Sequence, residues 1–520
     1  MARYALLLPF LGALLLYGGI PVFSQDVILD ETFQEDGTVL VDFGEDEQGR
    51  ALVVLPNQDH VVAGFTSAFG IDENFLLVRF DENGTLDETF GDSGFDGVAL
   101  TDFDGFDDRA NALARQEDGK LIAAGRAFID NLDYDFALAR YNEDGTLDPS
   151  FGENGLVISD FDGENDQVND LVIQEDGKIL AAGTAVIDLE SDFALARYNP
   201  DGTLDESFGT DGLVVTDFDG ADDQAHAVVL QNDGRILVAG TAVIDLDSDF
   251  ALAGYNEDGT LDETFGTDGL VITDFDGEDD IAYDLELQDD GSIVVVGSAL
   301  IDGDRDFALA RYDNQGILDE SFRTEDGNGL FATRQDQEDP ALNNTLLDRQ
   351  TLQDADELEP GLVVTDFDGE DDVAFRLLIQ EDEKILVAGS AVIDLDSDFA
   401  LARYNRDGSL DESFALEEPG LFDQEQDLPL GLLVTDFDGE DDQARDIEIQ
   451  GPDRILVAGT AVTDLSEDIA LARYVPADED DNDGITVSAA GCRISPNSAL
   501  GLEWLLFFFL ILLAKQRQKK

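Results

Sequence analysis

One phrase returns seven times along this chain: an aspartate-rich lead followed by a variant of Phe-Ala-Leu-Ala-Arg-Tyr. Between the second and fifth copies the spacing is a constant 57 residues. A fixed period of this length indicates one supersecondary unit that packs against its own copies. The repeat therefore constrains the architecture strongly, but it identifies neither a ligand nor a reaction. The copies begin at Phe75, Phe136, Phe193, Phe250, Phe307, Phe399 and Ile469.

The copy from Gly212 to Phe265 predicts four short strands. Their ranges are 212–218, 225–230, 235–243 and 249–255. Each range is rich in β-branched or alternating apolar residues and is bounded by turns of Gly, Asp and Asn. No segment between the turns has the length or the period of a helix. Each unit is therefore expected to form a small antiparallel sheet.

Four antiparallel strands per unit are typical of a β-propeller blade. The chain starts partway through a unit, with a strand expected at 38–43, and its last unit stops at Tyr474. The N-terminal strand can thus complete the C-terminal blade, which removes the open sheet edges that favour aggregation. We predict an all-β, seven-bladed β-propeller of four-stranded antiparallel blades over residues 25–476, closed by this pairing. A solenoid of β-hairpins is the alternative architecture.

Two recurring phrases, Asp-Gly-Thr-Leu-Asp-Glu-Ser-Phe-Gly and Asp-Phe-Ala-Leu-Ala-Arg-Tyr, resemble the bacterial delta-60 repeat family. The likeness covers about residues 29–474. It departs from the pattern at Gly254, which replaces the arginine, and at Ile469, which replaces the phenylalanine. The resemblance implies a β-propeller and implies almost nothing about activity.

The charge of the chain is extreme, with 119 Asp and Glu against 28 Lys and Arg and a formal net charge of −91. Such a surface repels nucleic acid and anionic lipid headgroups, because both bind through cationic partners. No nucleic-acid partner is therefore expected. Because 43% of the residues are hydrophobic, the chain can still build a large core. Its single cysteine, Cys492, excludes an intrachain disulfide.

The N-terminus carries a basic residue, an apolar stretch and then small residues, a pattern typical of secretory signal peptides. We predict that residues 1–24 are a signal peptide with a short helical segment, cleaved between Ser24 and Gln25. An uncleaved membrane anchor is the alternative. In either case the repeats are exported.

The C-terminus resembles the sorting signals of exported bacterial proteins, in which a protease removes a terminal helix. An acidic linker and sorting motif at 477–498 contains Gly491 and Cys492, the expected processing or anchoring residues. An apolar helical segment at 499–514, short for a membrane of about 30 Å, precedes a basic tail at 515–520, expected on the cytoplasmic side. A permanent single-pass anchor is the alternative. The expected location is the envelope or surface of a bacterium, with the protein anchored or released.

An acidic motif, Asp-Phe-Asp-Gly-x-x-Asp, recurs in six units. Carboxylates two residues apart around a glycine turn can converge on a hard cation such as Ca²⁺, which takes six to eight oxygen ligands. The alternative is that aspartate favours turns through hydrogen bonds to its own backbone. The candidate metal ligands are the first two aspartates of each copy: Asp102, Asp104, Asp160, Asp162, Asp217, Asp219, Asp274, Asp276, Asp366, Asp368, Asp436 and Asp438. The third aspartates are Asp108, Asp166, Asp223, Asp280, Asp372 and Asp442.

No sequence pattern marks an active site. The two histidines, His60 and His226, occupy non-equivalent positions in different units, so they form no histidine metal cluster. Repeated carboxylates suit a scaffold, whereas a catalytic site needs one blade to differ from the others. We therefore expect no catalytic residue and no enzyme. Neighbouring acids are expected to pair with the arginines of the repeated phrase, Arg140, Arg197, Arg311, Arg403 and Arg473.

The expected function is that of a surface binding or display scaffold for an unknown protein or glycan, with Ca²⁺ as a stabilising ion. Insertions at 323–360 and 415–430 fall at the same point of consecutive units, so both are expected on one face. Repeat proteins often place binding loops in such insertions. One alternative is a propeller enzyme, a lyase or glycoside hydrolase acting in the central channel, which an unrepeated acid or histidine cluster at the channel mouth would favour. Another is a structural surface-layer component.

Overall fold

The structure is a computed structural model, and the chain is described over most of residues 27–477. The described residues are 27–34, 36–43, 46–67, 72–91, 97–103, 106–129, 133–161, 164–218, 222–244, 246–275, 278–301, 303–322, 330–331, 360–367, 370–393, 395–415, 431–437, 440–463 and 466–477. The predicted signal peptide, its cleavage point at Ser24 and Gln25, the sorting motif with Gly491 and Cys492, and the terminal helical segments lie outside them. Within the described ranges, no helix is long and apolar enough to cross a membrane.

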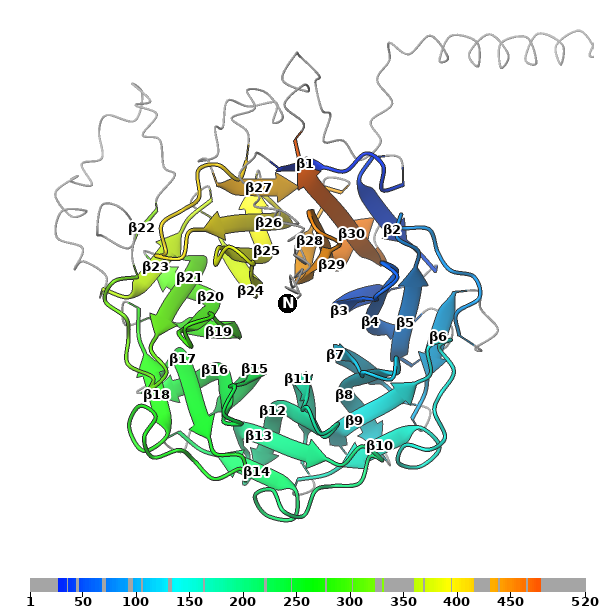
Figure 1. Cartoon of the computed structure of the whole chain (residues 1–520), viewed down its shortest axis with the longest axis vertical. Helices are drawn as coiled ribbons and strands as arrows, with labels where there is room; N and C mark the ends of the chain where they lie inside the picture. Colours follow the sequence, from blue (N-terminus) through cyan, green and yellow to red (C-terminus); the bar gives the residue numbers. More distant parts are fainter. Residues whose placement is uncertain are drawn as a thin grey trace, which may run out of the picture.

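Seven antiparallel sheets stand around a central axis, so the predicted seven-bladed β-propeller is confirmed (Figure 1). Blade 1 contains β3 (Glu47–Val54), β4 (His60–Thr66), β5 (Asn74–Phe80) and β6 (Val98–Thr101). Blade 2 contains β7 (Asp108–Arg115), β8 (Leu121–Ile129), β9 (Asp133–Tyr141) and β10 (Leu156–Ser159). Blade 3 contains β11 (Asp166–Ile173), β12 (Ile179–Ile187), β13 (Glu190–Tyr198) and β14 (Leu213–Thr216).

The remaining blades follow the same order from the axis outward. Blade 4 contains β15 (Asp223–Leu230), β16 (Ile236–Ile244), β17 (Asp247–Tyr255) and β18 (Leu270–Thr273). Blade 5 contains β19 (Asp280–Leu287), β20 (Ile293–Ile301), β21 (Asp304–Tyr312) and β23 (Leu362–Thr365), with a parallel strand β22 (Leu330–Phe331) at its edge. Blade 6 contains β24 (Asp372–Ile379), β25 (Ile385–Ile393), β26 (Asp396–Tyr404) and β27 (Leu432–Thr435). Blade 7 contains β28 (Asp442–Gln450), β29 (Arg454–Thr463) and β30 (Ser466–Pro476).

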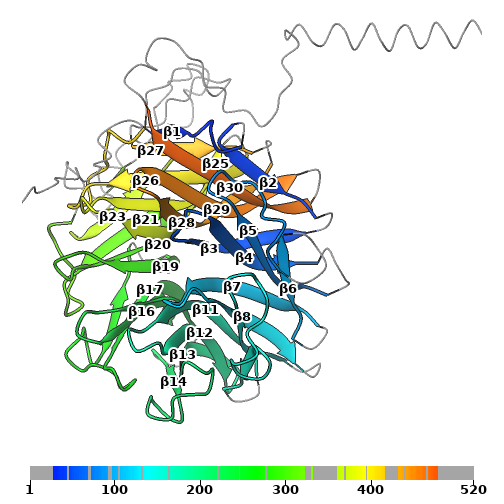
Figure 2. The same ribbon diagram turned by 45° about the vertical axis from the view of Figure 1, so that its right-hand side comes forward.

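Both ends of the described chain complete blade 7, as predicted from the partial units. Strand β2 (Thr38–Val41) pairs antiparallel with β30, from Val41 opposite Ile469 to Thr38 opposite Ala472. Strand β1 (Val27–Leu29) pairs with the following part of β30. Figure 2 shows the N-terminal β2 lying beside the C-terminal β30. The pairing closes the wheel and removes the free sheet edges of an open structure.

The repeat unit and the blade are offset by one strand. The four strands predicted between Gly212 and Phe265 exist, but the first, β14, pairs with β13 and is the outer strand of blade 3. The other three are the inner strands of blade 4. Each unit therefore spans two blades, and consecutive blades are linked by the chain itself.

Apolar side chains are buried between neighbouring blades. Between blades 5 and 6, for example, Phe307, Ile385 and Tyr404 are fully buried in one cluster. The arginines of the repeated phrase pair with the aspartate of a Leu-Asp-x-x-Phe segment, as predicted; this segment is the next one in the sequence, except that Arg473 pairs with the N-terminal Asp30. The Nε–Oδ2 distance is 2.9 Å for Arg140 and Asp148. The pairs are Arg140–Asp148, Arg197–Asp205, Arg311–Asp319, Arg403–Asp411 and Arg473–Asp30.

Candidate functional site

Each of the seven innermost strands changes register once, because one extra residue interrupts its pairing with the second strand. In blade 4, Ala225 pairs with Gly240 and Ala227 with Ala239, so His226 is the extra residue. A glycine on the second strand permits this bulge, since a Cβ at Gly240 would lie 1.9 Å from the Gln224 carbonyl oxygen. Bulges of this kind commonly redirect a side chain beside a functional site.

The seven bulge residues all line one cavity of about 310 Å³ among the innermost strands. Figure 1 shows these strands, β3, β7, β11, β15, β19, β24 and β28, surrounding the axis of the wheel. Most of the blade sequence is repeated from one blade to the next, yet the bulge position carries five different residue types. We call this set the channel ring: Arg50, Asn111, Asn169, His226, Tyr283, Phe375 and Arg445.

One side of the channel ring is a continuous stack of aromatic groups. The rings of His226 and Tyr283 are stacked with centroids 5.3 Å apart. Tyr283 meets Phe375 edge to face at 5.1 Å. The guanidinium of Arg445 lies 4.0 Å from the centroid of the Phe375 ring. The row of aromatic rings thus ends at a cation.

The other side of the cavity is cationic. Arg50, Arg109, Arg126 and Arg445 line it. Arg109 forms an ion pair with Glu73, whereas Arg50, Arg126 and Arg445 form none with any described residue. Burial, and then the nearby charge of Arg50, lowers the pKa of Arg445 to about 9. Unpaired cations concentrated in one cavity stand out in a chain of net charge −91.

Arg376, which follows the bulge in β24, reaches across the channel to three other innermost strands. Its guanidinium nitrogens lie 3.1 Å from Asp446 Oδ1, 3.4 Å from Asp284 Oδ1 and 3.9 Å from Asp170 Oδ1. Burial disfavours the charge of Arg376, but these aspartates raise its pKa above the usual value. The aspartates also accept backbone N–H groups of neighbouring blades, as Asp170 does from Val228 at 2.9 Å. This cluster ties four blades together in the channel.

Side chains of the channel ring are fixed by the next blade. The Asn111 and Asn169 amides donate to the carbonyl oxygens of Val168 and Ala225 at 2.8 and 2.7 Å. His226 Nδ1 lies 2.6 Å from the Ala282 carbonyl oxygen. Because a carbonyl oxygen only accepts, Nδ1 carries a proton, and Nε2 of the neutral imidazole is the nitrogen with a free lone pair. Burial lowers the pKa of His226, which keeps the ring neutral.

The predicted acidic motif forms a second kind of site, at the junctions between blades. Three aspartates come together at such a junction: the first and third of the motif, and the aspartate directly before the phenylalanine of the blade's third strand. One carboxylate oxygen from each lies within 4.8 Å of the other two. The second aspartates (Asp104, Asp162, Asp219, Asp276, Asp368 and Asp438) lie outside the described residues. We call the described sets junction clusters: Asp135–Asp160–Asp166, Asp192–Asp217–Asp223, Asp249–Asp274–Asp280 and Asp306–Asp366–Asp372.

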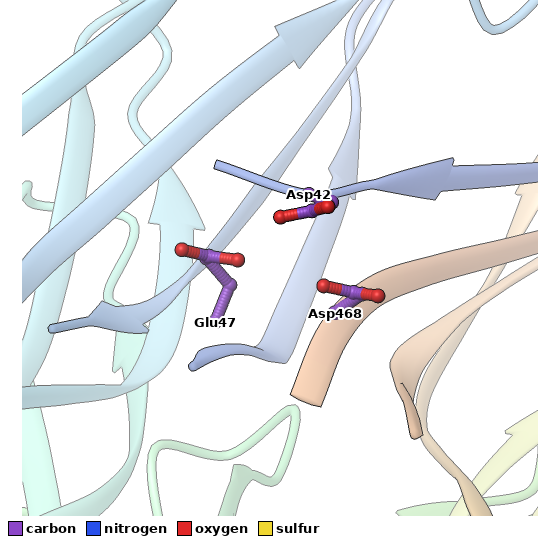
Figure 3. Close-up of side chains that lie close together, drawn as sticks. All are labelled: Asp42, Glu47 and Asp468. Carbon is purple, nitrogen blue, oxygen red and sulfur yellow. The ribbon is translucent and has the colours of Figure 1, made fainter. Parts of the chain in front are cut away.

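The junction that closes the wheel carries an equivalent cluster. Figure 3 shows the carboxylates of Asp42, Glu47 and Asp468 facing one another from the end of β2, from β3 and from β30. Glu47 is fully buried, and burial raises its pKa to about 7. Here the cluster joins the two ends of the propeller, as Asp42 and Asp468 belong to opposite ends of the chain.

The remaining two junctions differ from each other. At the junction of blades 6 and 7, burial and then the charges of Asp436 and Asp442 raise the pKa of Asp398 to about 8. At the junction of blades 1 and 2, Asn74 occupies the position that aspartate holds elsewhere, so Asp102 and Asp108 lack that third carboxylate.

The two histidines have different roles. His60, on the second strand of blade 1, is fully buried and stacked on Phe80 at 5.3 Å, so it belongs to the core. His226 belongs to the channel ring. An alignment of the seven units by their glycine-containing second strands would have revealed the variable bulge position. The acidic lead of the repeated phrase was the available signal for the third carboxylate of each cluster.

The fold and the channel define the molecule as a seven-bladed β-propeller with an unrepeated channel lining. Segments 61–90, 116–151, 174–208, 231–265, 288–322 and 380–414 match a family model described as "Domain of unknown function (DUF5122) beta-propeller". These matches support a bacterial β-propeller repeat family. No curated protein matches the chain.

Several solved structures are similar in fold. A protein of unknown function from Dyadobacter fermentans is 10% identical with a TM-score of 0.43, over 85% of this chain and 98% of that one. A PL25 ulvan lyase is 11% identical with a TM-score of 0.43, over 83% and 95%. Sqt1 from Chaetomium thermophilum is 11% identical with a TM-score of 0.38, over 86% and 100%. At these values the similarity assigns no function to the chain.

Proposed function

We propose that this protein is an exported surface scaffold whose central channel binds an acidic saccharide. The observation that carries the proposal is a group of three arginines, Arg50, Arg126 and Arg445, that share one cavity of an otherwise acidic protein and form no ion pair with a described residue. A half-buried cation without a counterion is costly, and a bound carboxylate or sulfate would compensate it. Export and surface display rest on the sequence patterns at the two ends.

The other lining groups suit a sugar ring. The aromatic rings of Tyr283 and Phe375 line the cavity beside Arg445, and Asn111, Asn169 and Gln167 are the amides that line it. A volume of about 310 Å³ lies at the lower end of the range for small-molecule sites. The combination of aromatic rings, amides and cations fits the apolar C–H groups, hydroxyls and acid group of one saccharide.

The test is binding of acidic and neutral oligosaccharides of equal length to the full chain. Arg445→Gln removes one unpaired cation, and we expect it to weaken acidic ligands at least about tenfold, since hydrogen bonds to charged groups contribute about 1.5–3 kcal/mol. Arg406→Gln is the matched control, because Arg406 is exposed and paired with Asp290 outside the cavity. Equal binding of neutral and acidic ligands, or equal losses in the two variants, would contradict the proposal.

A lyase acting in the same channel is the second candidate, favoured by the fixed tautomer of His226. Its free Nε2 is available as a general base, and the arginines could neutralise a substrate carboxylate. A glycoside hydrolase is less well supported, because it usually needs two carboxylates. Among the residues that line the cavity only Asp170 carries one, and that group is bound to Arg376 and Val228.

Turnover separates the two candidates. A lyase would release unsaturated, ultraviolet-absorbing products from an acidic polysaccharide, and His226→Gln would abolish their release while retaining binding. A scaffold would bind the same polysaccharide without products, and His226→Gln would affect affinity alone.

A further inference from the structure

The junction clusters lie apart from the channel, and each brings together three segments of two neighbouring blades. In the cluster of blades 3 and 4, Asp192 belongs to β13, Asp217 follows β14, and Asp223 begins β15. We propose that each junction cluster binds one Ca²⁺ ion, which fastens a blade to the next one.

The spacing of the carboxylates fits this ion. Calcium binds oxygen at about 2.3–2.6 Å, so two ligands on opposite sides of one ion are about 4.6–5.2 Å apart. The three oxygens of each cluster lie within 4.8 Å of one another, and all belong to carboxylates. A hard cation prefers such ligands, and the clusters contain no histidine or cysteine that would favour a softer metal.

Independent support comes from buried oxygens that lack a partner. Asp223 is fully buried, and its Oδ2 accepts the Phe218 N–H at 2.8 Å, whereas its Oδ1 has no hydrogen bond with any described residue. Asp166 repeats this arrangement with 1% exposure and the Phe161 N–H at 2.9 Å. The Oδ1 atoms of Asp280 and Asp372 are likewise buried and have no hydrogen bond within the part of the chain that the structure describes.

In one cluster two carboxylates share this property. Asp135, which is only 6% exposed and belongs to the same set as Asp166, also has an Oδ1 without a hydrogen bond to any described residue. Polar atoms buried in a protein nearly always have a partner. Two carboxylates with such oxygens, in one set of three carboxylates, therefore point to a cation as the common partner.

The backbone holds each site in place before an ion arrives. The Oδ2 bond to the phenylalanine N–H fixes the third aspartate of the motif, and the other two carboxylates extend from paired strands or their ends. At the closing junction, Asp42 and Asp468 come from the two ends of the propeller. An ion there would join them without a disulfide, which the single cysteine cannot provide.

The test is a count of retained ions in the full chain. The protein is equilibrated with Ca²⁺ and desalted in about 1 M sodium chloride, where a Debye length of about 3 Å suppresses binding to exposed acids. Elemental analysis should find at least one Ca²⁺ for each of the five clusters named above. Addition of a chelator should lower the melting temperature. Retention of no Ca²⁺, with an unchanged melting temperature in chelator, overturns the proposal.

The junction of blades 1 and 2 supplies matched variants. Asp223→Asn should remove one ion per chain. Asp108 is also fully buried, with an Oδ1 that has no hydrogen bond with any described residue, but Asn74 replaces the third carboxylate there, so Asp108→Asn should remove none. The gain-of-function variant Asn74→Asp should add one ion. Equal losses of Ca²⁺ from Asp223→Asn and Asp108→Asn overturn the assignment. So does the absence of an additional ion in Asn74→Asp, a result that does not depend on the folding of Asp223→Asn.

Discussion

Tyr198 donates a hydrogen bond from its Oη to Ser159 Oγ at 3.0 Å, and so joins the third strand of blade 3 to the outer strand of blade 2. The phenol is fully buried, and burial raises its pKa above the usual value. The same hydrogen bond recurs at five other junctions between blades. The closing junction is the exception, because Phe80 stands there in place of the tyrosine and Val41 in place of its hydroxyl partner. Both partners of the hydrogen bond are thus absent together. The other copies are Tyr141–Thr101, Tyr255–Thr216, Tyr312–Thr273, Tyr404–Thr365 and Tyr474–Thr435.

We predict that Tyr198→Phe destabilises the protein by about 1–2 kcal/mol, because Ser159 is left buried without its partner. The double variant Tyr198→Phe, Ser159→Val reproduces the pairing of Phe80 with Val41 and should recover most of the loss. Denaturant midpoints of the single and double variants measure the difference. A double variant no more stable than Tyr198→Phe would show that the hydrogen bond is not what the junction needs.

The sequence predicted the fold well because the information was repeated. Each of seven copies carried the same apolar strands and glycine turns, and the partial units at the two ends determined the closure through β2. It did not predict that β14 belongs to the preceding blade, because strand pairing between consecutive units leaves no local pattern. The sequence also did not predict β22, whose two residues pair in parallel with β23.

His60 should make the protein sensitive to acid. Burial lowers its pKa from 6.5 to about 3, so between these values the unfolded chain binds a proton that the folded chain does not. Stability then falls as the pH drops below about 6.5, by up to about 1.4 kcal/mol per pH unit from this group. The control is His60→Ile, since Leu or Ile occupies this position in the other blades, as Ile236 does. Melting temperatures from pH 7 to 4 should decline more steeply for the wild type than for His60→Ile, and parallel curves would refute the effect.

The closing pairing should be needed for a monomeric propeller. Deletion of residues 27–43 removes β1, β2 and Asp30, and leaves the edge of β30 exposed with Arg473 unpaired. An exposed edge strand pairs with other chains, so the truncated protein should aggregate or form dimers. A peptide of residues 27–43 added in trans should restore the monomer, as measured by light scattering. A monomeric truncated protein with an unchanged melting temperature would contradict this prediction.

The candidate sites were less predictable than the fold, for two physical reasons. A β-bulge shifts a strand by one residue, so the direction of His226 or Tyr283 could not be read from the alternation of apolar residues. The junction clusters combine residues from separate strands. Asp135 and Asp160 approach only because β9 pairs with β10, and the motif alone suggested partners two residues apart. For the second aspartate of each motif, the prediction stays untested.

Gly240 should control the channel although it lies outside it. Because an alanine Cβ would lie 1.9 Å from the Gln224 carbonyl oxygen and 2.8 Å from the Ala225 Cα, Gly240→Ala must push β15 away or flatten its bulge. We expect a loss of stability of about 2–4 kcal/mol, in the range for strain in a packed interior, together with loss of ligand binding as His226 is displaced. Ala242→Gly is the control, because Ala242 is fully buried on the same strand but pairs with Asp223, away from the bulge. It should lower the melting temperature and retain binding. Equal binding by both variants would mean that the bulge does not position the channel ring.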